Sequence, residues 1–72
     1  MTRLELLRLW DAEGSLAKVR KVGDRYGGPG RLRQIIYHGD LQHSISVVVA
    51  HKIEGGYGEL LQIYTLDQIE EC

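Results

Sequence analysis

The fold of this chain is decided by the stretch from Arg31 to Tyr64, which reads RLRQIIYHGDLQHSISVVVAHKIEGGYGELLQIY. Three runs within it are rich in β-branched and aromatic residues, a composition that is typical of strands. We place these strands at residues 31–38, 43–53 and 59–64. Glycine-bearing corners separate the three runs, so the stretch predicts antiparallel strands joined by turns.

The two corners are His38-Gly39-Asp40 and Gly55-Gly56-Tyr57-Gly58. Between them the side chains alternate with the period of two that a half-buried strand requires. One face of the middle run carries Ile45, Val47, Val49 and Ile53, and the other carries Ser44, Ser46, Ala50 and Lys52. In the last run the same alternation groups Leu61 with Ile63, and Leu60 with Gln62 and Tyr64.

A helix is predicted at residues 2–13, before the strands. Leu6, Leu7 and Trp10 fall on one stripe at helical spacing, and we expect Trp10 to be buried. Thr2 can cap the start of this helix, because Glu5 follows three residues later as in a capping box. Gly14 is expected to end it.

Residues 16–22 are ambiguous, since Leu16, Val19 and Val22 suit a helix and the two valines also suit a strand. A helix here, followed by a turn at Gly27-Gly28-Pro29-Gly30, would make a helix-turn-helix unit. A strand would let the sheet curl and close, which removes exposed edges. The strands that follow favour the second interpretation.

Residues 65–71 are predicted to form one helical turn, with Thr65 capping toward Gln68. Short strands, glycine-rich corners and this late helical turn together predict a mainly β fold, a small SH3-like barrel with an N-terminal α-helix. We expect one domain over residues 1–72, with the helix in residues 1–14 and the barrel in residues 15–72.

The composition limits the function classes. Cys72 is the single cysteine, so an internal disulfide is excluded and a reducing compartment, the cytoplasm, is expected. The three histidines lack thiolate partners at zinc spacing, so no metal site is predicted. Neither a signal peptide nor a membrane span is expected. A core this small commonly needs a partner subunit, which favours a homo-oligomer.

The net charge of −1 hides a strong segregation along the chain. Residues 14–38 carry a net charge of +5, whereas residues 39–72 carry −5. A basic middle can face an anion such as a nucleotide phosphate, a polyglutamate tail or nucleic acid. The two halves can equally pair with each other. The basic side chains of the middle are Lys18, Arg20, Lys21, Arg25, Arg31 and Arg33.

The segment Leu61-Gln62-Ile63-Tyr64, followed by Thr65-Leu66-Asp67-Gln68-Ile69-Glu70, resembles the Val-Gln-Ile-Tyr strand, helical turn and Leu-Glu ending of the plasmid-borne type II dihydrofolate reductases. These enzymes are trimethoprim-insensitive and SH3-like. Val19-Arg20-Lys21 is similar to the Val-Arg-Lys of their first strand, and Gly30-Arg31-Leu32 with Tyr37 is similar to their second.

The resemblance implies a homotetramer of barrels around one pore, in which NADPH passes a hydride to dihydrofolate. It implies that Gln62, Ile63 and Tyr64 line the pore as the catalytic strand, and that Lys21, Gln62 and Ile63 bind the cofactor. Hydride transfer needs two rings held in close alignment, so residues of this kind would act by positioning. Gln62 offers a donor and an acceptor, and Lys21 offers a charge for phosphate or the glutamate tail.

An alternative from a different class remains open: a non-enzymatic SH3-like binding module of phage or mobile-element type. It would contact protein or nucleic acid through the basic segment 18–33. If residues 61–64 have only a structural role, Leu61 and Ile63 belong to the core, whereas Gln62 and Tyr64 are ordinary outward residues of an edge strand and Lys21 is one of several surface cations.

Overall fold

A computed structural model of the chain describes residues 1–23, 28–38, 44–53 and 55–72. Helix α1 (Arg3–Glu13) and a 3-10 turn, η1 (Gly14–Leu16), precede the first strand. A second 3-10 turn, η2 (Leu66–Gln68), separates the last two strands. The five strands are β1 (Lys18–Lys21), β2 (Gly30–Tyr37), β3 (Ile45–Lys52), β4 (Glu59–Thr65) and β5 (Ile69–Glu71).

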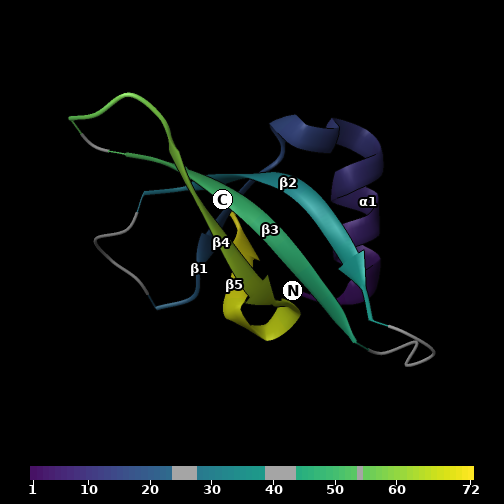
Figure 1. Cartoon of the computed structure of the whole chain (residues 1–72). Helices are drawn as coiled ribbons and strands as arrows, with labels where there is room; N and C mark the ends of the chain where they lie inside the picture. Colours follow the sequence, from purple (N-terminus) through teal and green to yellow (C-terminus); the bar gives the residue numbers. More distant parts are fainter. Residues whose placement is uncertain (24–27, 39–43, 54) are drawn as a thin grey trace.

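The strands form one antiparallel sheet in the order β4-β3-β2-β1-β5 (Figure 1). Four strands follow one another as a meander, and the 3-10 turn η2 then brings the chain back so that β5 pairs with β1. The predicted fold class is confirmed: a mainly β, SH3-like arrangement with an N-terminal helix. The hydrogen-bonded sheet has β4 and β5 at its two ends.

Helix α1 begins and ends where the sequence predicts. The Thr2 hydroxyl accepts from the Glu5 N–H at 3.1 Å, and the Glu5 carboxylate accepts from the Thr2 N–H at 3.2 Å. Hydrogen bonding to Thr2, first by its side chain and then by its backbone, lowers the pKa of the Glu5 carboxyl. This cap is therefore complete above that lowered pKa and weakens as the pH falls through it. Gly14 ends the helix with φ of 58°.

One hydrophobic core joins α1 to the sheet. Leu6 and Leu9 are the buried residues of the helix, so Leu9 rather than Leu7 completes the apolar stripe. Trp10 is only partly buried and packs at the side of the core, not within it. We call the helix-covered face of the sheet the inner face, and the opposite one the outer face. The sheet contributes to the core Ala17, Val19, Leu32, Ile45, Val47, Val49 and Ile69.

The ambiguous segment is a strand, which excludes the helix-turn-helix alternative. β1 pairs with β2 on one side and with β5 on the other, and Val19 is fully buried. β5 itself lies within the predicted helical turn at 65–71, which was wrong beyond Gln68. The reason is that Ile69 fills the core and its strand completes the hydrogen bonds of β1.

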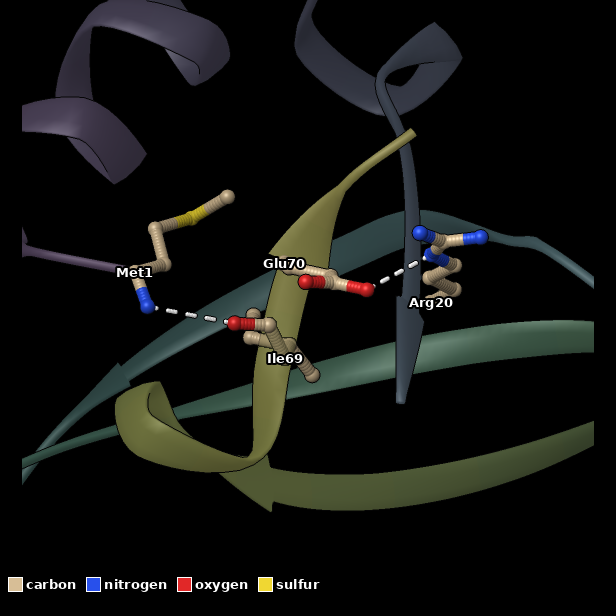
Figure 2. A network of polar contacts seen from close by, with 4 residues as sticks. All are labelled: Met1, Arg20, Ile69 and Glu70. Atoms are coloured by element: carbon tan, nitrogen blue, oxygen red, sulfur yellow. Dashed lines mark hydrogen bonds and ion pairs between the residues drawn. The ribbon is translucent and has the colours of Figure 1, made fainter. Parts of the chain in front are cut away.

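Two polar contacts hold β5 in place (Figure 2). The Met1 amino nitrogen donates to the Ile69 carbonyl oxygen at 3.1 Å. It also donates to the Leu66 carbonyl oxygen of the preceding turn η2 at 3.0 Å. The Arg20 Nε donates to the Glu70 carboxylate at 2.7 Å across β1 and β5. The start of the chain and β5 therefore lie side by side.

The alternation predicted for β3 and β4 is correct, but two assignments of burial are wrong. Leu61 and Ile63 are exposed at 54% and 65%, because they lie on the outer face, which α1 does not cover. Their neighbour Tyr64 packs against the core instead. Ile53 follows the end of β3 and is 43% exposed, so it is no core residue either. The predicted corner at 38–40 lies largely outside the described residues, whereas the turn at 55–58 is present.

Gly30 lies on β2 directly beside β3. A Cβ at this position would clash with Val49 Cγ1 and lie 3.0 Å from the Ala50 carbonyl oxygen, with His51 Cε1 at 3.1 Å. We expect Gly30→Ala to lower the free energy of unfolding by about 1–3 kcal/mol, because an added methyl group overpacks this crossing. Urea unfolding checks this, with Gly28→Ala as the control, since no atom lies within 4 Å of a Cβ built there. Equal stabilities of the two variants would contradict it.

Candidate functional site

An open groove of about 750 Å³ crosses the outer face of the sheet at the end where β2 begins and β3 ends. Four strands contribute to it, so it belongs to the sheet as a whole and not to one loop. We call it the outer groove. It is lined by Lys18, Pro29, Gly30, Arg31, Ala50, Lys52, Gly58 and Glu59.

The pairing of the strands places these side chains together. Lys18 of β1 is the partner of Arg31 on β2, which in turn is the partner of Ala50 on β3. Because partners in a sheet point to the same face, the three side chains form one row across three strands. Lys52 lies two residues along β3 from Ala50, and is therefore on the same face.

The floor of the groove is Ala50, which is only 5% exposed although it faces outward. Its partner on β4 is Leu61, so the small side chain lies between two larger neighbours, Arg31 and Leu61. A methyl group between long side chains leaves a hollow. The size of residue 50 therefore sets the depth of the groove.

The charge of the groove is predominantly positive. Among the described residues, Lys18, Arg31 and Lys52 line it, against the carboxylate of Glu59. Glu59 also lies 3.9 Å from the Nη1 atom of Arg33, and both side chains are well exposed. An exposed pair at this distance contributes little to stability. The groove thus combines exposed cations with one acid that partly neutralises its rim.

Only part of the predicted basic segment belongs to this site. Lys18 and Arg31 line the groove, and Arg33 lies at its rim through Glu59. Arg20 is bound to Glu70, Lys21 lies at the end of β1 beside Ile69, and Arg25 falls outside the described residues.

Sequence reasoning missed Lys52 as part of the site. Along the chain Lys52 belongs to the acidic segment 39–72, and only the pairing of the strands brings it close to cations of the basic middle. A signal was nevertheless available, because the alternation of β3 groups Lys52 with Ala50 on one face.

The residues implied by the reductase resemblance are not brought together within one chain. Gln62, Ile63 and Tyr64 lie on β4, whereas Lys21 lies on β1, and β2 and β3 separate the two strands in the sheet. Gln62 and Ile63 are exposed on opposite faces of β4.

Tyr64 is half-buried, and its hydroxyl lies 2.9 Å from the Nε2 atom of His51. The two rings meet edge to face, with centroids 5.8 Å apart. This contact gives Tyr64 a structural partner on the inner face. Its ring packs against the core beside its strand partner Val47.

Within residues 1–23, 28–38, 44–53 and 55–72, no three His, Cys, Asp or Glu side chains are grouped so that they could hold a metal ion. The described helices include none that is both long and apolar enough to cross a bilayer. The comparisons with known proteins found no family model, no curated protein and no solved structure that matches this chain. The class that the structure itself defines is a small mainly β, SH3-like domain with a basic groove on its outer face.

Glu59 is expected to limit the affinity of the outer groove for anions. We expect Glu59→Gln to raise the affinity for a short oligonucleotide about threefold to tenfold at low salt, because it removes one negative charge and releases Arg33. Fluorescence anisotropy with a labelled oligonucleotide measures this change. Glu13→Gln, an equal change of charge on α1, is the control and should leave the affinity nearly unchanged. Weaker binding by Glu59→Gln would contradict this role.

Proposed function

We propose that this protein is a small SH3-like binding module that holds the sugar–phosphate backbone of nucleic acid in its outer groove. The observation that carries the proposal is the juxtaposition of Lys18, Arg31 and Lys52 around the small floor residue Ala50. Flexible and exposed cations of this kind neutralise phosphates without reading a base sequence.

The shape of the site favours an extended anion over a small one. The cations follow one another across neighbouring strands, which lie about 4.8 Å apart in a sheet, and do not converge on one point. An open groove can continue past its own ends, so a polymer with repeated charges can occupy its full length. Nucleic acid is the partner with this repeat.

We propose that the protein acts in the cytoplasm, since its one cysteine, Cys72, is a free thiol.

The negative net charge does not oppose this function. The acids near α1 lie on the other side of the sheet: Glu5, Glu13 and Glu71 line a hollow beside the helix, together with Arg8. At physiological salt an exposed charge is screened beyond about 8 Å, so a phosphate in the groove experiences mainly the local cations.

Salt dependence tests the proposal. Three phosphate contacts predict a log–log slope of about −2 for a single strand, and hence about 20-fold weaker binding between about 50 and 200 mM salt. Anisotropy titrations of the whole chain with a labelled oligonucleotide measure it. Arg8→Glu on α1 is the control for non-specific charge and should bind like the parent protein. Absence of binding at low salt would refute the site. A marked loss of affinity in Arg8→Glu would refute it as well, because that residue lies outside the groove.

A second candidate function is the NADPH-dependent reduction of dihydrofolate in the pore of a homotetramer. One observation favours it: Gln62 is exposed on an end strand of the sheet, where a neighbouring chain can approach it. Within one chain β2 and β3 separate Lys21 from β4, so Lys21 of a neighbouring chain would have to lie close to β4 in the tetramer.

NADPH oxidation with dihydrofolate, in the presence of trimethoprim, tests this second candidate. Activity that Gln62→Ala abolishes, in a protein that sediments as a tetramer, would support it. A monomer without turnover would exclude it and leave the nucleic-acid proposal untouched.

A further inference from the structure

We infer that the outer groove selects single-stranded over duplex nucleic acid, with Tyr57 as a stacking platform for a base. This inference rests on the proposed function and names the form of its ligand. Tyr57 is fully exposed, although a tyrosine ring is mostly apolar. The hollow beside it, of about 540 Å³, is lined by Lys52, Ile53, Gly55, Gly56 and Tyr57. Lys52 lines both this hollow and the outer groove, so the two hollows adjoin at its side chain.

The turn that carries Tyr57 is held by its own backbone. The Ile53 N–H donates to the Gly58 carbonyl oxygen, and the Gly56 N–H donates to the Ile53 carbonyl oxygen, both at 3.3 Å. Gly55 and Gly58 have φ of 74° and 130°, which other residues rarely adopt. Residues 55–58 thus present the ring to solvent, where a base can stack on it.

Apolar side chains adjoin the cations on the other side of the groove. Leu61 is the partner of Ala50, and Ile63 follows on the same face beside its partner Val48. Both are exposed by more than half and have no cover among the described residues. Cations alone would suit any phosphate backbone, but cations flanked by a ring and by aliphatic side chains suit a ligand with accessible base faces.

Duplex and single strand differ in that property. Bases within a duplex are stacked and paired, so a nearly flat protein surface meets only phosphate and sugar. The bases of a single strand can turn outward and stack on an aromatic ring while the backbone stays on the cations. The aromatic ring at 57 and the aliphatic side chains at 61 and 63 gain contacts only with the single strand.

The test compares one labelled oligonucleotide of mixed sequence with its blunt duplex, in anisotropy titrations of the whole chain at low salt. We expect the single strand to bind about tenfold more tightly. Tyr57→Ala is expected to weaken single-strand binding about tenfold and to leave duplex binding unchanged, whereas Tyr57→Phe keeps the ring and the affinity. Because Tyr57 is fully exposed, these substitutions do not affect folding.

The experiment distinguishes failure of this inference from failure of the proposed function. Equal or tighter binding of the duplex, or no effect of Tyr57→Ala on the single strand, would overturn the selection of single strands while leaving the groove as a phosphate site. Absence of binding to both probes would refute the proposed function itself, and this inference with it.

Discussion

The double substitution of Lys18→Glu and Arg31→Glu is expected to reduce the affinity for an oligonucleotide by about 100-fold at low salt. The two side chains are direct partners on β1 and β2, so the change turns the centre of the outer groove from positive to negative. The salt slope should fall toward zero, because Lys52 alone remains to release a counterion. Anisotropy titrations at several salt concentrations measure both quantities.

The fold should survive this double substitution, because both side chains are exposed and neither belongs to the core. Circular dichroism checks that point. Arg20 and Glu70 provide a matched control, since exchanging them as Arg20→Glu with Glu70→Arg keeps the net charge and reverses an ion pair outside the groove. If the exchanged pair lost as much affinity as the double substitution, binding would depend on general charge and not on this groove.

Ile69→Ala is expected to lower the free energy of unfolding by about 2–5 kcal/mol, which is a large part of the stability of so small a domain. Ile69 is fully buried among Val19, Leu32 and the leucines of α1. It also stands at the start of a three-residue strand, so a loosened side chain would weaken the pairing of β5 with β1 as well.

Ile63→Ala is the matched control, because it removes the same atoms from a side chain that is 65% exposed. Its effect should stay within about 0.5 kcal/mol. Urea unfolding followed by Trp10 fluorescence measures both variants. A small effect at position 69 would mean that β5 contributes little to the stability of the core.

Local rules were sufficient for the elements whose signals lie within a few residues. The capping box of Thr2 and Glu5 predicted the start of α1, and the period of two predicted β3 and β4. These signals depend on neighbours along the chain, so no tertiary knowledge is needed to interpret them.

The predictions that failed depend on contacts between distant parts of the chain, such as which element covers each face of the sheet. Alternation shows that Leu61 and Ile63 share a face, but it does not show that α1 covers the opposite one. β5 was missed because three residues carry too weak a periodic signal, and its strand conformation depends on β1 as a partner. Lys52 was missed for a similar reason, since only the pairing of β1, β2 and β3 brings it to Lys18 and Arg31.

The bulge in β2 shows how a small irregularity aligns the outer face. The register of β2 against β3 shifts between Leu32 and Gln34. After this shift Ile35 packs against the core, and Gln34 and Ile36 are the partners of Val48 and Ser46 on the outer face. Arg33, at the shift itself, reaches across β3 to Glu59 on β4. A shift of register at one residue thus extends the basic rim of the groove over β3.

Among the described residues, acids line the hollow beside α1 and cations line the outer groove, a separation of charge that the net charge conceals. A distant polyanion interacts with a net charge of −1. Close to the protein, the uneven distribution of charge orients the molecule so that the outer groove faces the polyanion. The association rate should consequently fall as salt is added, as it does for cationic proteins, although the net charge alone predicts the opposite trend. Orientation before contact would then be a property of the whole sheet and helix together.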